Sequence, residues 1–307
     1  MTKQITSILF ISLPITITMG ILFPSIGKIL SHNLLLMLAI LLFLNLLKLD
    51  LKDLLTFFLK PKFLLLFTCL KLIIIPLFFL WVFNLIYPSM SLAVFLLAGI
   101  STGLGAPFVA NFTGAKLSIV VGTTIISSLF VPISLPTLTY IIFQENFSIP
   151  YLEMIALLFF ALILPLMVSF LSQKYLPKFI TKLEKCSFQL SIVLIIIINY
   201  TVFSMYSELF TLNPKQVIIT LFIASTLFII FGIIGFYFVK IIKNYSRDEQ
   251  FGGFISMAYI NNLVVIVFTT NFFDWQIAAL AAMYNLPYYI GIIVLREISE
   301  KVYGKKL

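Results

Sequence analysis

One basic residue lies in the middle of a long apolar run. Lys71 falls within LLLFTCLKLIIIPLFFLWVF, eight residues or more from either end of the predicted helix. A charge at bilayer depth costs at least about 2.5 to 3.5 kcal/mol on insertion scales, and at this depth the side chain does not reach the interface easily. Three arrangements would relieve the cost: a neutral amine, carbonyl groups at a broken helix, or an anionic solute bound to the ammonium. Each predicts that Lys71 faces a cavity or a partner.

A second stretch, AGISTGLGAPFVANFTGAKLSIVVGTTIISS, combines helix-disfavouring and polar residues. The helix-disfavouring residues are Gly103, Gly105, Pro107 and Gly114. They predict an unwound helix, which is tolerated at membrane depth only where it is buried in protein or lines a cavity. Oxygens for a cation, or hydrogen bonds for a solute, could come from Asn111, Thr113, Thr123 and Thr124. The alternative interpretation is close packing of small residues between helices.

A third stretch, GGFISMAYINNLVVIVFTTNFF, contains Ser256 and two adjacent amides, Asn261 and Asn262. Neighbouring positions on a helix are about 100° apart, so at least one amide should meet the helix bundle rather than lipid. We expect a binding site for an ion or a solute here. Interhelical hydrogen bonding, worth about 0.6 to 2 kcal/mol, is the alternative.

These residues must be positioned by membrane helices. The chain is 62% hydrophobic and 10% charged, with a mean hydropathy of +1.16, which excludes an ordinary soluble domain. Runs of suitable length predict an all-α integral membrane protein of one domain, residues 1–307, with ten spans. The spans are 6–23, 31–48, 63–86, 91–111, 117–143, 151–171, 187–206, 216–241, 251–272 and 276–296.

The basic residues predict the topology of these spans. Loops on the side of the N-terminus hold 17 of them, the opposite side has only Lys28 and Lys215, and Lys71 completes the 20. The positive-inside rule then places both termini in the cytoplasm. It also explains the net charge of +9 without a nucleic-acid partner. All acidic residues fall in loops or near span ends, so none is available to pair with Lys71.

The two halves of the chain look like repeats, about 1–147 and 148–307. Leu13 and Pro14 with a later proline, Pro24, resemble Leu164 and Pro165 with Pro177 in the sixth span. Because each half has five spans, the second half must be inserted upside down, as in secondary transporters with interrupted helices. Nucleotide-binding, zinc and nucleophile motifs are absent from the sequence, so we expect no enzyme and no bound cofactor.

Several segments, in order and at suitable spacing, resemble the bile-acid:sodium symporter family. They are FLNLLKLDLKDLLTFFLKPKFLL, KLIIIP, the region of Asn111, and INN followed by AALAAMYNLPYYIG. The resemblance implies two inverted five-span repeats, with discontinuous helices 4 and 9 crossing at the membrane centre. It also implies a panel domain of spans 1, 2, 6 and 7 and a core domain of spans 3 to 5 and 8 to 10.

The sodium ligands that this resemblance implies carry over only in part. Lys71 stands where the family has a glutamine before Pro76, and Met257 stands where it has a glutamate. The family's Ser-Asn becomes Ala110 and Asn111, and Thr124 corresponds to a threonine of the fifth span. Losing the carboxylate and placing an ammonium beside the site should abolish strong sodium binding. We therefore expect Lys71 to occupy the place of a sodium ion, with coupling to protons or no coupling.

The combined prediction is secondary transport of an organic anion or similar small solute across the cytoplasmic membrane, with the lipid bilayer as the other partner. An auxin-efflux-carrier-like permease shares the crossed inverted-repeat plan and is an alternative. A sensor or scaffold that kept the fold without transporting is another. The sequence predicts no particular oligomeric state.

Overall fold

The computed structural model describes residue 12 and residues 14–47, 61–103, 105–144, 149–243 and 246–303. Regular structure in these residues is helical, and their one β pairing is an isolated bridge between Thr102 and Ile260. The expected all-α class is therefore confirmed. Six of the described helices are long and apolar enough to cross a membrane, and a bent pair within Pro177–Met205 would make a seventh.

The six long apolar helices follow the predicted runs closely in several places. They are Pro24–Leu46, Lys62–Ile86, Leu117–Phe143, Tyr151–Tyr175, Pro214–Ile242 and Ile277–Lys301. Two shorter apolar helices are present, Pro88–Ala98 and Asn262–Phe272. The first overlaps the predicted fourth span from residue 91 onward, and the second lies within the predicted ninth span. The fourth and ninth spans are thus each interrupted, as the family resemblance implies.

Some predicted boundaries differ from the observed ones. Residues 24–30, expected to connect two spans, form a helix that begins at Pro24, because proline suits the first helical turn. A helix starts at Pro177, ten residues before the predicted seventh span, for the same reason. Residues 6–11 and 13 of the predicted first span lie outside the described residues, and residues 14–22 of that span are helical.

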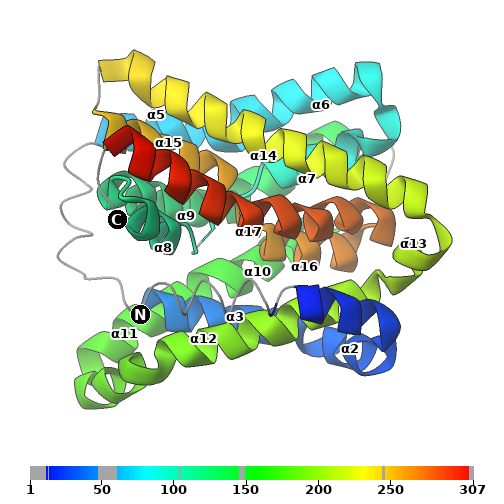
Figure 1. Ribbon diagram of the computed structural model, residues 1–307, viewed down its shortest axis with the longest axis horizontal. Helices are drawn as coiled ribbons and strands as arrows, with labels where there is room; N and C mark the ends of the chain where they lie inside the picture. Colours follow the sequence, from blue (N-terminus) through cyan, green and yellow to red (C-terminus); the bar gives the residue numbers. More distant parts are fainter. Residues whose placement is uncertain are drawn as a thin grey trace. The chain divides into compact units, whose positions relative to one another are not determined.

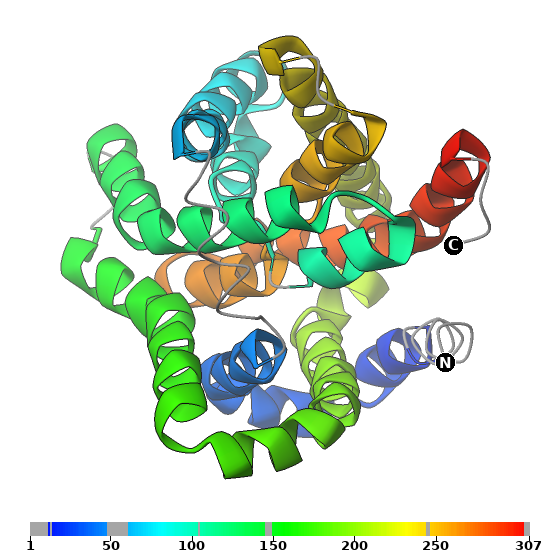
Figure 2. The ribbon, with the colours of Figure 1, turned by 90° about the vertical axis from the view of Figure 1, so that its left-hand side faces the viewer.

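The chain divides into two compact units, and each contains segments from both halves of the sequence. The first unit comprises the described residues of 1–49 with Phe159–Thr220. Its helices are α2 (Pro24–Leu30), the 3-10 turn η1 (Ser31–Asn33), α3 (Leu34–Leu46), the π-helical turn η4 (Phe159–Ile163), α11 (Leu164–Tyr175), α12 (Pro177–Met205) and α13 (Ser207–Leu212). Figure 2 shows α3 between α11 and α12, which it contacts, and α2 packs on α12 as well.

The second unit comprises the described residues of 50–158 with Leu221–Leu307. Its helices are α5 (Pro61–Cys69), the π-helical turn η2 (Leu70–Ile74), α6 (Ile75–Ile86), η3 (Pro88–Met90), α7 (Ser91–Ala98), α8 (Ala106–Thr113), α9 (Leu117–Phe143), α10 (Tyr151–Leu158), most of α14 (Pro214–Lys243), α15 (Arg247–Ala258), α16 (Asn262–Phe272) and α17 (Trp275–Tyr303). In this unit α6 packs on α7, α16 on α17 and α9 on α15 (Figure 1).

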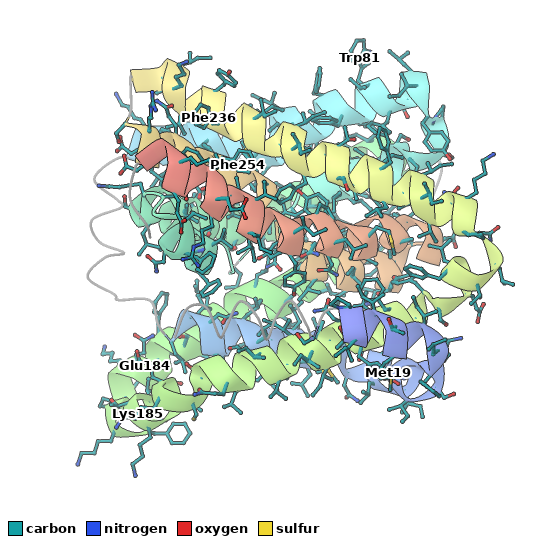
Figure 3. All side chains as sticks on the ribbon, viewed as in Figure 1. Met19, Trp81, Glu184, Lys185, Phe236 and Phe254 are labelled. Atoms are coloured by element: carbon teal, nitrogen blue, oxygen red, sulfur yellow. The ribbon has the colours of Figure 1, made fainter. Side chains whose placement is uncertain are left out.

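Apolar side chains cover the outside of the second unit as well as its interior. Trp81 points outward from α6 and is 61% exposed, and Phe78 on the same helix is 50% exposed (Figure 3). Phe95 and Phe268, in contrast, are fully buried. A helical unit that is apolar on both sides is the expected form of a protein whose solvent is lipid.

Candidate functional site

Two apolar helices of the second unit are interrupted by short non-helical segments. The first break lies between α7 and α8, and the second lies between α15 and α16. The breaks pair as antiparallel backbone, because the amide of Gly103 donates to the carbonyl of Tyr259 at 2.8 Å and the amide of Asn261 donates to the carbonyl of Ser101 at 2.9 Å. Each break therefore pairs polar backbone groups of the other. Such groups would cost free energy if they were left unpaired in an apolar environment.

Glycine is required where the two breaks meet. A Cβ atom on Gly103 would lie 2.7 Å from the carbonyl oxygen of Ile260, closer than real Cβ contacts allow. Gly114 ends α8 in the left-handed region, with φ of 68°, where glycine is unstrained. Pro107 lies in the first turn of α8 and Gly105 precedes that turn, close to the Tyr288 hydroxyl. All four residues singled out as helix-disfavouring thus lie at the break or at the end of α8.

Lys71 lies on the π-helical turn η2, just before Pro76. Proline has no amide hydrogen, and its ring crowds the carbonyl four residues earlier. The turn widens accordingly, and the amide of Ile75 donates to the carbonyl of Leu70, five residues back. We attribute this widening to Pro76. It makes Lys71 part of the kind of irregular turn that often occurs at functional sites.

The Nζ amine of Lys71 reaches the carbonyl end of α15. Its Nζ donates to the carbonyl of Ser256 at 3.1 Å and to that of Met257 at 3.4 Å. The side chain is 1% exposed. The end of a helix carries about half a negative charge, so a cation is stabilised there. These contacts place carbonyls of a broken helix next to Nζ, and both a neutral amine and an ammonium can donate to them.

The other carbonyls at the end of α15 also have partners. Four carbonyls at a helix end lack a partner within the helix, and leaving them unpaired in a buried unit is costly. The carbonyl of Ile255 accepts the amide of Tyr259, and the carbonyl of Ala258 accepts the Tyr284 hydroxyl at 2.8 Å. Together with the Lys71 contacts, these bonds pair all four. Three of these four carbonyls are therefore paired by Lys71 or Tyr284, which lie far away in the sequence.

Hydroxyl groups connect this helix end to α9 and to the first break. Thr102 donates from Oγ1 to the carbonyl of Ser256 at 2.6 Å, and Thr123 donates to Oγ of Ser256 at 2.8 Å. Ser127 accepts the amide of Thr102 at 3.1 Å and donates to the carbonyl of Thr123 at 2.6 Å. Thr102 and Ser127 were not predicted as site residues. Ser127 has a signal in the sequence, because its spacing of four from Thr123 places both residues on one face of α9.

The two adjacent amides have different surroundings. Asn261 precedes the first residue of α16, and its side-chain nitrogen is buried without a hydrogen-bond partner. Asn262 donates to Oδ1 of Asn285 on α17 at 2.6 Å, and the side-chain nitrogen of Asn285 is left unpaired. The hydroxyl of Ser101 is likewise buried and without a partner. The backbone carbonyl of the same residue accepts the amide of Asn261. Buried polar groups without a partner are uncommon in native structures, and a bound water or ion is one explanation for them.

Three of the predicted site residues form no hydrogen bond with Lys71 or Ser256 in the structure. The side chain of Asn111 is exposed on α8. Thr113 donates to the carbonyl of Val109 on its own helix at 2.8 Å. Thr124 donates likewise to Val120 at 2.7 Å, and its neighbour Thr123 makes the bond to Ser256 instead.

The backbone carbonyls next to Lys71 already accept hydrogen bonds. Sodium would need oxygen ligands, yet the carbonyls of Ser256 and Met257 already accept from the Lys71 ammonium. No cluster of three or more histidine, cysteine, aspartate or glutamate residues suited to a metal is found in the described part of the chain. The two carbonyls that Nζ of Lys71 reaches are therefore occupied by that contact.

Comparison with protein families gives one assignment. The family model described as the Sodium Bile acid symporter family matches residues 35–213, more than half of the chain. A search of curated proteins gave no match. The matched region includes Lys71 and the first helix break, and the family consists of transporters rather than enzymes. Together with the apolar helices, the match identifies a multi-pass membrane protein. The chain belongs to the sodium bile acid symporter family.

Proposed function

We propose that this protein is a secondary transporter for an organic anion or similar small solute, in which Lys71 takes the place of a transported sodium ion. Membership of a symporter family supports transport. The observation that carries the proposal about Lys71 is its pair of hydrogen bonds to the carbonyls of Ser256 and Met257. An ammonium bound in this way supplies a positive charge at the helix end without any ion from solution.

Electrostatics supports this exchange of one cation for another. The negative end of the α15 dipole stabilises one positive charge. A second cation about 4 Å away would be repelled by about 4 kcal/mol at an effective dielectric constant near 20. Sodium would also lack the carboxylate that the family resemblance implies, because Met257 stands at that position. Strong sodium binding beside a charged Lys71 is therefore unfavourable.

The amine permits two modes of transport. If Lys71 keeps its proton throughout the cycle, solute moves down its own gradient with no coupling ion. If Lys71 releases and regains a proton during the cycle, the proton becomes the coupling ion. In either mode the unpaired donors of Asn261 and Asn285 would be available to an anionic solute.

We extend the proposal to the architecture. The ten predicted spans would form two inverted repeats, about 1–147 and 148–307, with both termini in the cytoplasm and the protein in the cytoplasmic membrane. The first compact unit contains most of the segments assigned to the panel domain, and the second contains most of those assigned to the core. Movement of one against the other would give alternating access.

Uptake by proteoliposomes tests the proposed function. The purified protein would be tested with a set of organic anions that includes a bile acid, in sodium or choline buffers and with or without a pH gradient. We expect uptake to differ by less than about twofold between sodium and choline, because no sodium site remains to be filled. Dependence on the pH gradient would indicate proton coupling. Strictly sodium-dependent uptake would contradict the role of Lys71, and the absence of any uptake would favour a sensor or scaffold.

A further inference from the structure

The end of α11 and the first turns of α12 carry four lysines in a short segment of the first unit. They are Lys174, Lys178, Lys182 and Lys185, and all four side chains are exposed. The last three have the spacing i, i+4, i+7, which places them on one face of α12. We call the four residues the lysine face.

The opposite side of this segment is fixed by packing. Ile180 is 5% exposed and forms a buried cluster with Leu44 and Leu47. Leu183 packs against the same cluster. On a helix, Ile180 is about 160° to 200° around the axis from Lys178 and Lys182. Because Ile180 is anchored, the lysine face is directed away from the first unit.

The charge of the lysine face is not compensated within the described residues. None of its lysines forms an ion pair there, and the ion pairs observed in that part of the chain lie elsewhere. Glu184 adjoins Lys185 in the sequence (Figure 3), and it forms no ion pair with a lysine of this face. By helical geometry it lies about 100° around the axis from Lys185 and about 200° from Lys182. Like charges four residues apart destabilise a helix. An anionic partner would remove that cost.

Apolar side chains border the lysine face. Tyr175, Leu176 and Phe179 are 67%, 56% and 59% exposed, and Nζ of Lys174 lies 5.3 Å from the centre of the Tyr175 ring. Residues Pro177–Ser187 are also bent by 58° from the rest of α12, so they do not continue the direction of the span. Exposed aromatic and apolar side chains beside lysines are typical of helices that lie in the membrane interface.

We propose that the lysine face binds the phosphate groups of anionic phospholipids in the leaflet next to it. The bilayer is the surface that a multi-pass protein always meets, and it offers negative phosphates together with an apolar layer. The lysines match the first property, and the exposed residues from Tyr175 to Phe179 match the second. The proposal does not depend on whether the protein transports a solute.

Titration with short-chain lipids tests the proposal. The full-length protein in an uncharged detergent would be titrated with dioctanoyl phosphatidylglycerol or dioctanoyl phosphatidylcholine while its melting temperature is followed. We compare wild type with a variant in which Lys174, Lys178, Lys182 and Lys185 are changed to Gln. A matched control changes four exposed lysines elsewhere to Gln, namely Lys116, Lys215, Lys240 and Lys301. A third variant changes the lysine face to Arg.

Phosphatidylglycerol should stabilise the wild type, the matched control and the Arg variant at similar concentrations. The Gln variant of the lysine face should need at least about tenfold more, since each lysine near an anionic surface contributes about fivefold. About 0.5 M salt should remove the difference. An unchanged response of the Gln variant, an equal loss in the matched control, or equal stabilisation by phosphatidylcholine would overturn the proposal. Stabilisation by glycerol 3-phosphate that is lost in the Gln variant would point to a free phosphate and overturn the lipid assignment.

Discussion

Two lysines, one in each compact unit, have opposite surroundings. Lys71 in the second unit is 1% exposed and donates to carbonyls of Ser256 and Met257. Lys28 in the first unit has a side chain that is 47% exposed and pairs with the carboxylate of Glu208 at 2.8 Å. Lys71 is buried and contacts backbone carbonyls without a carboxylate partner among the residues that the structure describes. Lys28 pairs with a carboxylate and is exposed to solvent.

The difference predicts which lysine matters more. An exposed ion pair is screened by solvent and contributes little. A buried ammonium is strongly coupled to its surroundings, because any change in its partners leaves a charge or a carbonyl unpaired in a medium of low dielectric constant. Mutations around Lys71 should therefore have large effects, and mutations around Lys28 should have small ones.

The largest effect should come from Gly103→Ala, which disturbs the crossing that creates the helix end. The added Cβ would lie 2.7 Å from the Ile260 carbonyl oxygen, so the two breaks must separate. We expect destabilisation of about 2 to 4 kcal/mol and loss of transport, measured by thermal unfolding in detergent and by uptake. Gly114→Asn is a comparison, because asparagine tolerates the left-handed conformation. A Gly103→Ala protein as stable as this comparison would mean that the crossing is not close.

Lys71→Met comes next and removes the buried charge while keeping an unbranched side chain. The carbonyls of Ser256 and Met257 then lose a donor and stay buried. We expect this change to destabilise the protein by about 1 to 3 kcal/mol. Uptake should fall at least tenfold. Lys62→Met, at an exposed position of α5, is the matched control and should change stability by less than about 0.5 kcal/mol. If uptake survives Lys71→Met at the wild-type rate, the tethered-cation role is lost.

Thr102→Val should have a smaller effect, because it removes one of the donors on the Ser256 carbonyl while Lys71 remains. We expect destabilisation of about 1 kcal/mol, the size of one interhelical hydrogen bond in a membrane protein. Combining Thr102→Val with Lys71→Met should cost more than the two changes separately, since the carbonyl then has neither donor. If the destabilisation of the double variant equals the sum for the two single variants, the two donors do not act on a shared acceptor.

The smallest effect should come from the exposed pair in the first unit. The hydrogen bond from Lys28, and then its charge, lower the pKa of Glu208 below its ordinary value of 4.5. A lowered carboxyl pKa stabilises the folded state above the unfolded pKa, and this stabilisation disappears as the pH falls through the folded pKa. Lys28→Met should therefore leave the melting temperature at pH 7 nearly unchanged, and any difference from wild type should vanish in acid. A difference that grows below pH 4 would contradict this assignment.

Composition and residue counting predicted much of the fold. Long apolar runs gave the helical class, and the charge census isolated Lys71 before any contact was known. Glycine and proline also marked the first break, because their backbone preferences are local. The second break lies at Tyr259, Ile260 and Asn261, none of which disfavours a helix strongly. The second break pairs with the first. The periodicity of a sequence does not specify a contact between such distant segments.

The site could be predicted only in part for the same reason. Lys71, Ser256 and Asn262 carry bonds between distant segments, whereas Thr124 bonds its own helix and Asn111 is exposed. One helical position, about 100°, decides whether Thr123 or Thr124 faces Ser256. Asn285 pairs with Asn262 from a helix 23 residues later, which no local pattern specifies.

Sodium binding by the wild-type protein tests the central claim most directly. Thermal unfolding would be compared in sodium chloride and in choline chloride at equal ionic strength, without any solute. A site with a Kd of about 10 mM would contribute about 1.4 kcal/mol in about 100 mM sodium, which shifts the melting temperature by a few degrees. The variant Lys71→Gln with Met257→Glu has the residues that the family resemblance implies for sodium and serves as the positive comparison. If Lys71 replaces the ion, the wild type shows no sodium-specific shift, and a sodium-specific rise in its melting temperature would contradict the account.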